Sequence, residues 1–240
     1  MLTKERLLIV QNKYQTFKEN VYREYAQHLF LSSLYQVKNS NKILFKGGTA
    51  YRIAYKSPRF SEDLDFSACQ IGKKEIEEII LSALENLSNN GMECDIEESK
   101  ETTGGYLAKL YLKIYGKNIL ISIQISLRKK IGNDYDIVDI LSEYIPTYQA
   151  YLLPKREMIG EKIQAALTRS KPRDFYDIYF ILRNGELTVS ERDKLKKISA
   201  ILEKKKIKFG DELSIFLPKS MKPIISDFPK PLLTELEKFF

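Results

Sequence analysis

The sequence predicts an α+β protein, in which a mixed or mostly antiparallel sheet is flanked by helices and followed by a helical C-terminal part. Three observations lead to this fold class. Apolar residues recur at helical spacing near the N-terminus, alternating runs typical of strands occupy the middle of the chain, and helical spacing returns after about residue 150. We therefore expect two domains, residues 1–150 as an α/β core with a long N-terminal helix and residues 151–240 as a helical domain that contributes to the same site.

The first elements follow from the positions of apolar side chains. Residues 3–38 are predicted as one helix because apolar residues recur every three or four positions: Leu7, Val10, Tyr14, Phe17, Val21, Tyr25 and Leu29. The apolar run 43–45 is a short strand that leads into Gly47 and Gly48. Residues 49–56 are predicted as a short helix that Thr49 caps and that ends before Pro58.

The middle of the chain supplies the remaining predicted strands. "EDLDFSA" (62–68) alternates as a strand does, and a helix over 73–91 follows it. The segments on either side of "TTGG" (102–105) form a hairpin. The run "KNILISIQISLRK" (117–129) is the clearest strand, with its isoleucines on one face and Gln124 on the polar face.

Helices fill the C-terminal part. One begins near Pro154, a second has Pro172 in its first turn and Gly185 after its end, and another closes the chain at 232–240. A fourth, over 190–206, is rich in lysine. This basic helix either follows a phosphate backbone or is an ordinary solvated surface.

Composition narrows the function classes. The chain has 240 residues, a net charge of +7, one histidine and two cysteines. These counts argue against a histidine-based catalytic triad, a zinc site and a disulfide framework, and we expect His28 to be a packed or surface residue. With no signal peptide and no apolar run of membrane-spanning length, we expect a cytoplasmic protein without a membrane partner. The positive charge favours a polyanionic partner such as nucleic acid.

Asp63 and Asp65 are candidate metal ligands. Two positions apart on a strand, they share one face, while Leu64 and Phe66 point into a core. Aspartate is disfavoured in strands, and paired carboxylates suit Mg²⁺, which prefers oxygen ligands. The alternative is an exposed strand whose acids are merely solvated.

Gly47, Gly48 and Thr49 are candidate phosphate-binding residues. Glycines allow backbone N–H groups to approach a ligand closely, at the point where a helix is predicted to begin. A Gly-Gly pair alone is more often a plain turn. Together with Asp63 and Asp65, however, it can hold the phosphates and the metal of one nucleotide.

These residues carry a family resemblance. The stretch "KGGTAYRIAYKSPRFSEDLDFS" (46–67) resembles the signature of the nucleotidyltransferase AbiEii/AbiGii toxin family, a branch of the polymerase-β-like nucleotidyltransferases. "EKIQAALTR" (161–169) and "KPRDFYDIYF" (171–180) resemble two further motifs of the family, in the same order along the chain. The resemblance implies a nucleotidyltransferase-like core.

The resemblance also implies roles for individual residues. Asp63 and Asp65 would hold Mg²⁺, Gly48 and Thr49 would contact the phosphates of an NTP, and Gly47 belongs to the same turn. Lys162 would bind a phosphate or support transfer. Asp174 would be a catalytic acid, and a part for Asp177 is left open. Without the resemblance, Lys162 belongs to a solvated face and Asp174 compensates a helix dipole.

The resemblance further implies a toxin that transfers a nucleotidyl group from an NTP to an acceptor such as tRNA, with a cognate antitoxin as partner. Gln124 departs from the pattern, because the superfamily commonly has a third carboxylate on this strand, and the departure argues against a two-metal mechanism. The alternatives are phosphoryl or nucleotidyl transfer to a protein or small molecule, and a nucleotide-binding module without catalysis.

Overall fold

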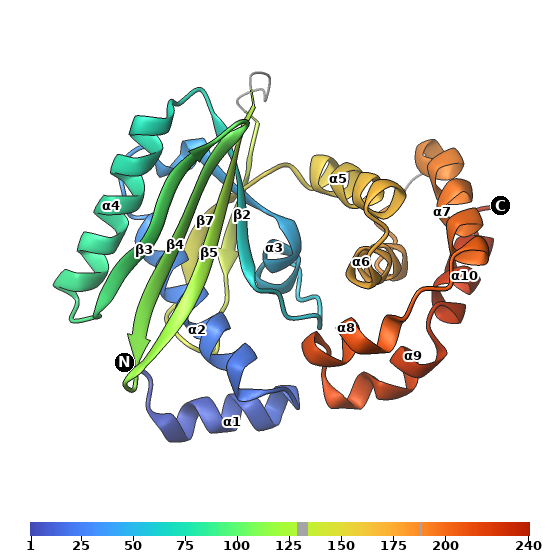
Figure 1. The fold of residues 1–240 in the computed structure, drawn as a ribbon, viewed down its shortest axis with the longest axis horizontal. Helices are drawn as coiled ribbons and strands as arrows, with labels where there is room; N and C mark the ends of the chain where they lie inside the picture. Colours follow the sequence, from blue (N-terminus) through green and yellow to red (C-terminus); the bar gives the residue numbers. More distant parts are fainter. Residues whose placement is uncertain (129–133, 188) are drawn as a thin grey trace. The chain divides into compact units, whose positions relative to one another are not determined.

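The computed structural model describes residues 1–128, 134–187 and 189–240. The chain divides into two compact units, Met1–Pro154 and Lys155–Phe240, and each is described by itself. The first unit contains a sheet and helices, and the second is helical (Figure 1). The α+β fold class is therefore confirmed.

The sheet of the first unit has seven strands in the order β3-β4-β5-β2-β1-β7-β6. It is mixed, since β2 runs parallel to β5 and β1 parallel to β7, whereas the other neighbours are antiparallel. The strands are β1 (Ile43–Lys46), β2 (Asp63–Cys69), β3 (Cys94–Thr102), β4 (Gly105–Ile114), β5 (Lys117–Arg128), β6 (Asp136–Ile140) and β7 (Tyr148–Leu152). The hairpin of β3 and β4 is confirmed, whereas β6 and β7 have no counterpart in the sequence prediction.

Helices cover one face of the sheet and leave a polar strip on the other. Helix α2 (Lys18–Leu34) packs against α4 (Lys73–Asn89) and β5, and the isoleucines of β5 that alternate toward the core are buried. Helix α3 (Gly47–Ile53) follows directly after β1 and packs against β1 and β2. The alternation of β2 and β5 places the polar side chains of both strands on one face of the sheet, with Leu64, Phe66 and the buried isoleucines on the other.

The prediction of one long N-terminal helix is wrong. The structure has α1 (Lys4–Tyr14) and then α2, separated at Gln15, which adopts a left-handed conformation with φ 48°. A left-handed residue ends a helix because the chain can no longer continue its hydrogen-bond ladder. The apolar spacing continues across the break from Tyr14 to Phe17, so periodicity alone does not reveal it.

A buried ion pair joins α2 to α3. Arg52 Nε lies 2.6 Å from Glu24 Oε1, and the hydroxyl of Tyr144 donates to Glu24 at 2.7 Å. The guanidinium of Arg52 also lies 3.9 Å from the centroid of the Phe60 ring. Because both charged side chains are almost fully buried, loss of either partner leaves the other charge uncompensated. This cluster therefore fixes α3, the helix that follows the glycine turn.

The only histidine of the chain is buried beside this cluster, which agrees with a packed role. His28 is 4% exposed, and its Nδ1 lies 2.9 Å from the hydroxyl of Tyr148. Burial of the imidazole lowers the pKa of His28 to about 4 from an ordinary value of 6.5. His28 therefore stays neutral in the folded protein at pH values where the unfolded chain already binds a proton.

The second unit is built from helices. The predicted start and end of one of them, α6, are confirmed. Pro172 occupies the first turn of α6, and Gly185 follows its end with φ +64°. None of the helices in the described parts of the chain has the length and apolarity that crossing a bilayer requires. The helices are α5 (Lys155–Thr168), α6 (Pro172–Arg183), α7 (Arg192–Lys204), α8 (Phe209–Phe216), α9 (Lys222–Asp227) and α10 (Lys230–Glu237).

We predict that the free energy of unfolding falls by about 2 kcal/mol between pH 7 and pH 5 through His28 alone. The unfolded chain takes up a proton near pH 6.5 and the folded chain does so only near pH 4, so acid favours unfolding across this window. Urea titrations at several pH values measure the slope. The His28→Asn variant is the control, and its slope in this window should be nearly flat. Equal slopes for the two proteins would contradict the assignment.

Candidate active site

The turn between β1 and α3 is packed directly against the carboxylate of Asp65. Gly47 has φ +82°, and a Cβ atom placed there would lie 2.2 Å from Oδ2 of Asp65. Two constraints therefore require glycine at this position, the left-handed backbone and the absence of space. The close approach brings the Gly47 backbone alongside a carboxylate.

Gly48 is enclosed by the segment that precedes β2. A Cβ atom at Gly48 would lie 2.6 Å from Nη2 of Arg59 and 2.9 Å from Oγ of Ser61. The same segment is held from α2, because the side-chain amide of Gln27 donates to the carbonyl oxygens of Ser61 and Glu62 at 3.1 and 2.9 Å. The backbone of the glycine turn is thus positioned from two sides.

The prediction that Thr49 caps α3 is wrong. The helix begins at Gly47, so Thr49 is its third residue and is 1% exposed. Its hydroxyl donates to the carbonyl oxygen of Asp63 at 2.5 Å. The hydroxyl is therefore engaged within the protein, where it joins α3 to the first residue of β2.

Asp63 and Asp65 lie on one face of β2, with both side chains partly exposed. Between and beyond them, Leu64 and Phe66 are fully buried on the other face. On the neighbouring strand β5, Ser122 lies beside Asp63 and Gln124 lies beside Asp65. Gln124 thus occupies the place across from Asp65 where a third acid was expected. Among the described residues, no group of three or more carboxylate, histidine and cysteine side chains is arranged to hold a metal ion.

This donor set fits a magnesium ion that is completed by its substrate. Mg²⁺ retains several waters and is commonly bound through one or two carboxylates plus phosphate oxygens, rather than by a full protein cage. Two partly exposed aspartates on one strand, next to a glycine turn, supply that minimum. The amide of Gln124 adds hydrogen bonding beside them but no negative charge.

Lys46 is a site residue that sequence reasoning missed. It is the last residue of β1 and pairs in register with Asp65, so it lies on the same face of the sheet. Its side chain is largely buried, and its ammonium donates to the hydroxyl of Ser126 at 3.3 Å. A buried cation beside the aspartates reduces their mutual repulsion. In the sequence, the position of Lys46 directly before Gly47 and Gly48 was the signal that could have identified it.

Lys162 and Asp174 belong to the second unit, where each has an ion-pair partner. The ammonium of Lys162 lies 2.7 Å from Oδ2 of Asp177, and both side chains are mostly buried. Asp174 is fully buried and receives hydrogen bonds from Arg169 Nε and from the backbone N–H of Lys171, both at 3.0 Å. Asp174 thus lies in the first turn of α6, where a carboxylate compensates the helix dipole.

The cations spaced seven residues apart along α5 form a ladder of ion pairs. Lys155, Lys162 and Arg169, seven residues apart, pair with Glu186, Asp177 and Asp174, which follow one another in reverse order along α6 and the segment after it. Antiparallel packing of α5 and α6 explains this reversal. These cations thus hold two helices together instead of forming a solvated face.

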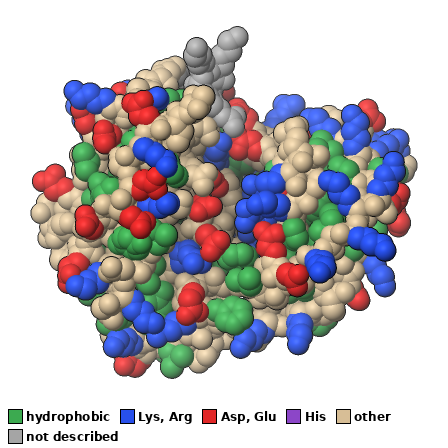
Figure 2. Space-filling view, viewed as in Figure 1, with side chains coloured by type: hydrophobic (Ala, Val, Ile, Leu, Met, Phe, Trp, Pro, Cys, Tyr) green, Lys and Arg blue, Asp and Glu red, His purple; other side chains and the backbone are tan. Residues whose placement is uncertain are grey.

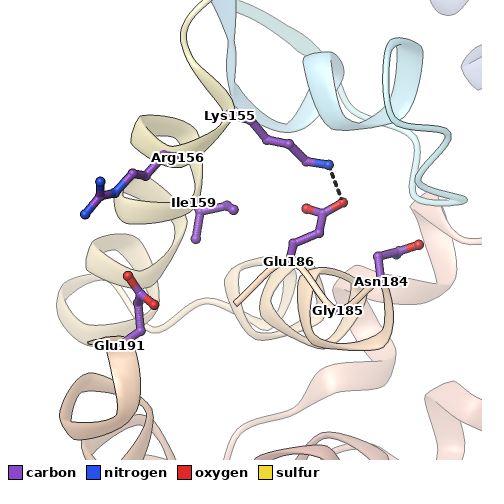
Figure 3. A pocket seen from close by; sticks show the side chains of 7 residues that line it. All are labelled: Lys155, Arg156, Ile159, Asn184, Gly185, Glu186 and Glu191. Carbon is purple, nitrogen blue, oxygen red and sulfur yellow. Dashed lines mark ion pairs between the residues drawn. The ribbon is translucent and has the colours of Figure 1, made fainter. Parts of the chain in front are cut away.

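The second unit also contains a cavity of about 670 Å³ beside this ladder. Figure 3 shows the ion pair of Lys155 and Glu186 on one side of the cavity and Glu191 on the other, with Ile159 between them. The nitrogen–oxygen distance in the pair is 2.8 Å. Charges of both signs line this cavity, so it does not select a ligand by net charge.

Comparison with known proteins decides the family. Residues 29–236 match the family model described as "Nucleotidyl transferase AbiEii toxin, Type IV TA system". The chain belongs to this family. The family assigns it to the nucleotidyltransferase enzymes and to toxins that are encoded with an antitoxin, and so implies an NTP substrate and an antitoxin partner.

Two solved structures from Helicobacter pylori share the fold. JHP933 is similar with a TM-score of 0.66 and 17% identity, over 93% of each chain. A second structure, described as a "putative nucleotidyltransferase", gives a TM-score of 0.59 and 16% identity, over 99% of this chain and 96% of that one. No match was found among curated protein sequences.

We predict that Gly47→Ala destabilises the first unit by about 1–3 kcal/mol more than Gly116→Ala does. Both glycines have positive φ, so both variants carry the same kind of backbone strain, but only at Gly47 does a new Cβ meet another group. Urea unfolding followed by circular dichroism measures the difference. Equal losses in the two variants would show that Asp65 does not pack against the turn.

Proposed function

We propose that this AbiEii protein is a Mg²⁺-dependent enzyme that transfers a nucleotidyl group from an NTP to an acceptor such as tRNA. The observation that carries the proposal is the packing of the glycine turn against Asp65, with Asp63 on the same face of β2. This arrangement puts a backbone suited to phosphate beside two carboxylates suited to a metal. Since NTP and tRNA are cytoplasmic, we propose the cytoplasm as the location.

The proposed reaction replaces a phosphoanhydride bond of the NTP with a phosphodiester bond to the acceptor. A hydroxyl of the acceptor attacks the α-phosphorus of the NTP and its proton passes to water. The bond from that phosphorus to the oxygen bridging to the β-phosphate breaks, and pyrophosphate leaves with the electron pair. A magnesium ion bound by Asp63 and Asp65 would neutralise phosphate charge. The backbone N–H groups of Gly47 and Gly48 would orient the phosphates, and the hydrogen bond from Thr49 would hold Asp63 in place.

Activation of the attacking hydroxyl rests on fewer groups than in a site with three acids. Gln124 beside Asp65 cannot accept a proton in the way a carboxylate does. We therefore propose a single-metal site, in which the two aspartates and the phosphates of the substrate share the negative charge. Lys46 would limit the repulsion between the aspartates before the metal binds.

Lys162 is the phosphate-binding candidate that the family resemblance implies. We propose that its ammonium binds a phosphate of the NTP, while the carboxylate of Asp177 holds it in one orientation. Asp174 has no exposed surface, and hydrogen bonds already engage its carboxylate. We therefore propose it as a positioning residue that fixes α6 and Arg169, in place of the catalytic role that the resemblance implies.

We predict that Asp65→Asn lowers nucleotidyl transfer at least about 100-fold, because the amide no longer offers a full negative charge to the metal. The assay incubates the protein with Mg²⁺, each NTP labelled at the α-phosphate and total tRNA. Asp95→Asn, which changes an exposed aspartate on strand β3, is the matched control and should retain activity.

The position of the label separates this function from its alternatives. Incorporation from α-labelled but not γ-labelled NTP indicates nucleotidyl transfer, and the reverse indicates phosphoryl transfer. Label on protein with unlabelled tRNA would overturn the proposed acceptor. Absence of labelling with every NTP, for wild type as for Asp65→Asn, would favour a nucleotide-binding module without catalysis.

A further inference from the structure

The net charge of the chain is concentrated in one short segment. The first unit, residues 1–154, has 20 Lys and Arg against 19 Asp and Glu. The second unit has 19 against 13, and residues 192–208 alone have 8 against 2. Outside this basic segment the second unit is balanced, with 11 of each sign. The segment therefore carries +6 of the net charge of +7.

The lysines of the basic segment are exposed and form no ion pair with any residue that the structure describes. None of them forms an ion pair within residues 1–128, 134–187 and 189–240. Arg192 differs, since its guanidinium donates to the carbonyl oxygen of Phe240. The exposed lysines are Lys194, Lys196, Lys197, Lys204, Lys205, Lys206 and Lys208.

Many cations outside this segment are paired with carboxylates. In the first unit, several lysines are matched by glutamates, as in the pairs Lys73–Glu101 and Lys113–Glu93 at 2.6 Å. On α5 of the second unit, the cations are used in the ladder with α6. A requirement for solubility alone does not explain why the net positive charge is concentrated in one segment while the charges of the rest of the chain are balanced.

The fold holds this segment with its lysines outward. The apolar side of α7 is buried through Leu195, Ile198 and Leu202, and α7 packs against α5 and α10. After Lys204 the chain becomes extended, at Lys205 and again at Lys208, before α8 begins at Phe209. Figure 2 shows Lys and Arg side chains gathered on the right of the view, over the region where Figure 1 draws α7.

We propose that the basic segment binds the sugar–phosphate backbone of the RNA acceptor. The charge distribution calls for a polyanion, and the choice of RNA rests on the proposed function. Lysine is a compact point charge without the planar fork of arginine, and the segment has no aromatic residue on which a base can stack. Binding is therefore expected to be strongly salt-dependent and nearly independent of sequence.

The test measures binding of a fluorescent single-stranded RNA and of total tRNA to the full chain, without NTP, over a range of salt concentrations. The variant Lys196→Gln/Lys197→Gln/Lys204→Gln removes three exposed lysines from α7. We expect its affinity to fall at least about tenfold, and the slope of log K against log salt to become shallower by about 2, as for three lost phosphate contacts.

The matched control removes the same charge elsewhere. Lys38→Gln/Lys222→Gln/Lys230→Gln changes three exposed lysines outside the segment, and it should retain both affinity and slope. Unchanged RNA binding by the α7 variant, or an equal loss in the control, would overturn the proposal. Binding to phosphatidylserine vesicles is measured in parallel. If the α7 variant lost vesicle binding but kept RNA binding, the proposal would also be overturned and the segment would be assigned to a membrane surface.

The outcome is separable from that of the proposed function. Because the assay contains no NTP, Asp65→Asn should bind RNA as well as wild type does. RNA binding through the segment without any labelling from NTP would leave this inference standing while the proposed enzymatic function fails. Labelling of tRNA together with unchanged RNA binding by the α7 variant would support the proposed enzymatic function and overturn this inference.

Discussion

The close approach of Gly47 to Asp65 is the constraint on which the candidate site depends. It fixes where β1 ends, it admits no side chain, and it places the glycine turn against a carboxylate of the neighbouring strand. The surrounding contacts maintain the same geometry. The hydroxyl of Thr49 holds Asp63, and the buried pair of Arg52 and Glu24 holds α3 against α2. The first unit thus stabilises one short junction from several directions, as a preorganised site requires.

Charge is used in two different ways in this protein. Buried or partly buried cations such as Arg52 and Lys162 each face a specific carboxylate and contribute to structure. The lysines of residues 192–208 pair with no carboxylate in the described parts of the chain, and their segment carries nearly all of the net charge. Composition alone gives only the total of +7. The structure separates the cations that hold helices together from those available to a polyanionic partner.

Much of the first unit follows from local sequence patterns, because alternation and helical spacing report which side chains enter a core. That reasoning identified the shared face of Asp63 and Asp65 and the polar face that bears Gln124. It missed contacts between residues distant in the chain. The pairing of Lys46 with Asp65 depends on strand order, and the partners of Lys162 and Asp174 depend on how α5 and α6 pack. The break at Gln15 was hidden because the apolar spacing continues across it.

The central claim is that the glycine turn and the two aspartates bind one metal–nucleotide complex. Isothermal titration of an unreactive NTP analogue, with and without Mg²⁺, tests it most directly. The account predicts that Mg²⁺ strengthens binding of the analogue to wild type by at least about tenfold, and that this gain disappears in Asp65→Asn while metal-free binding is retained. Equal enhancement by Mg²⁺ in both proteins would contradict it.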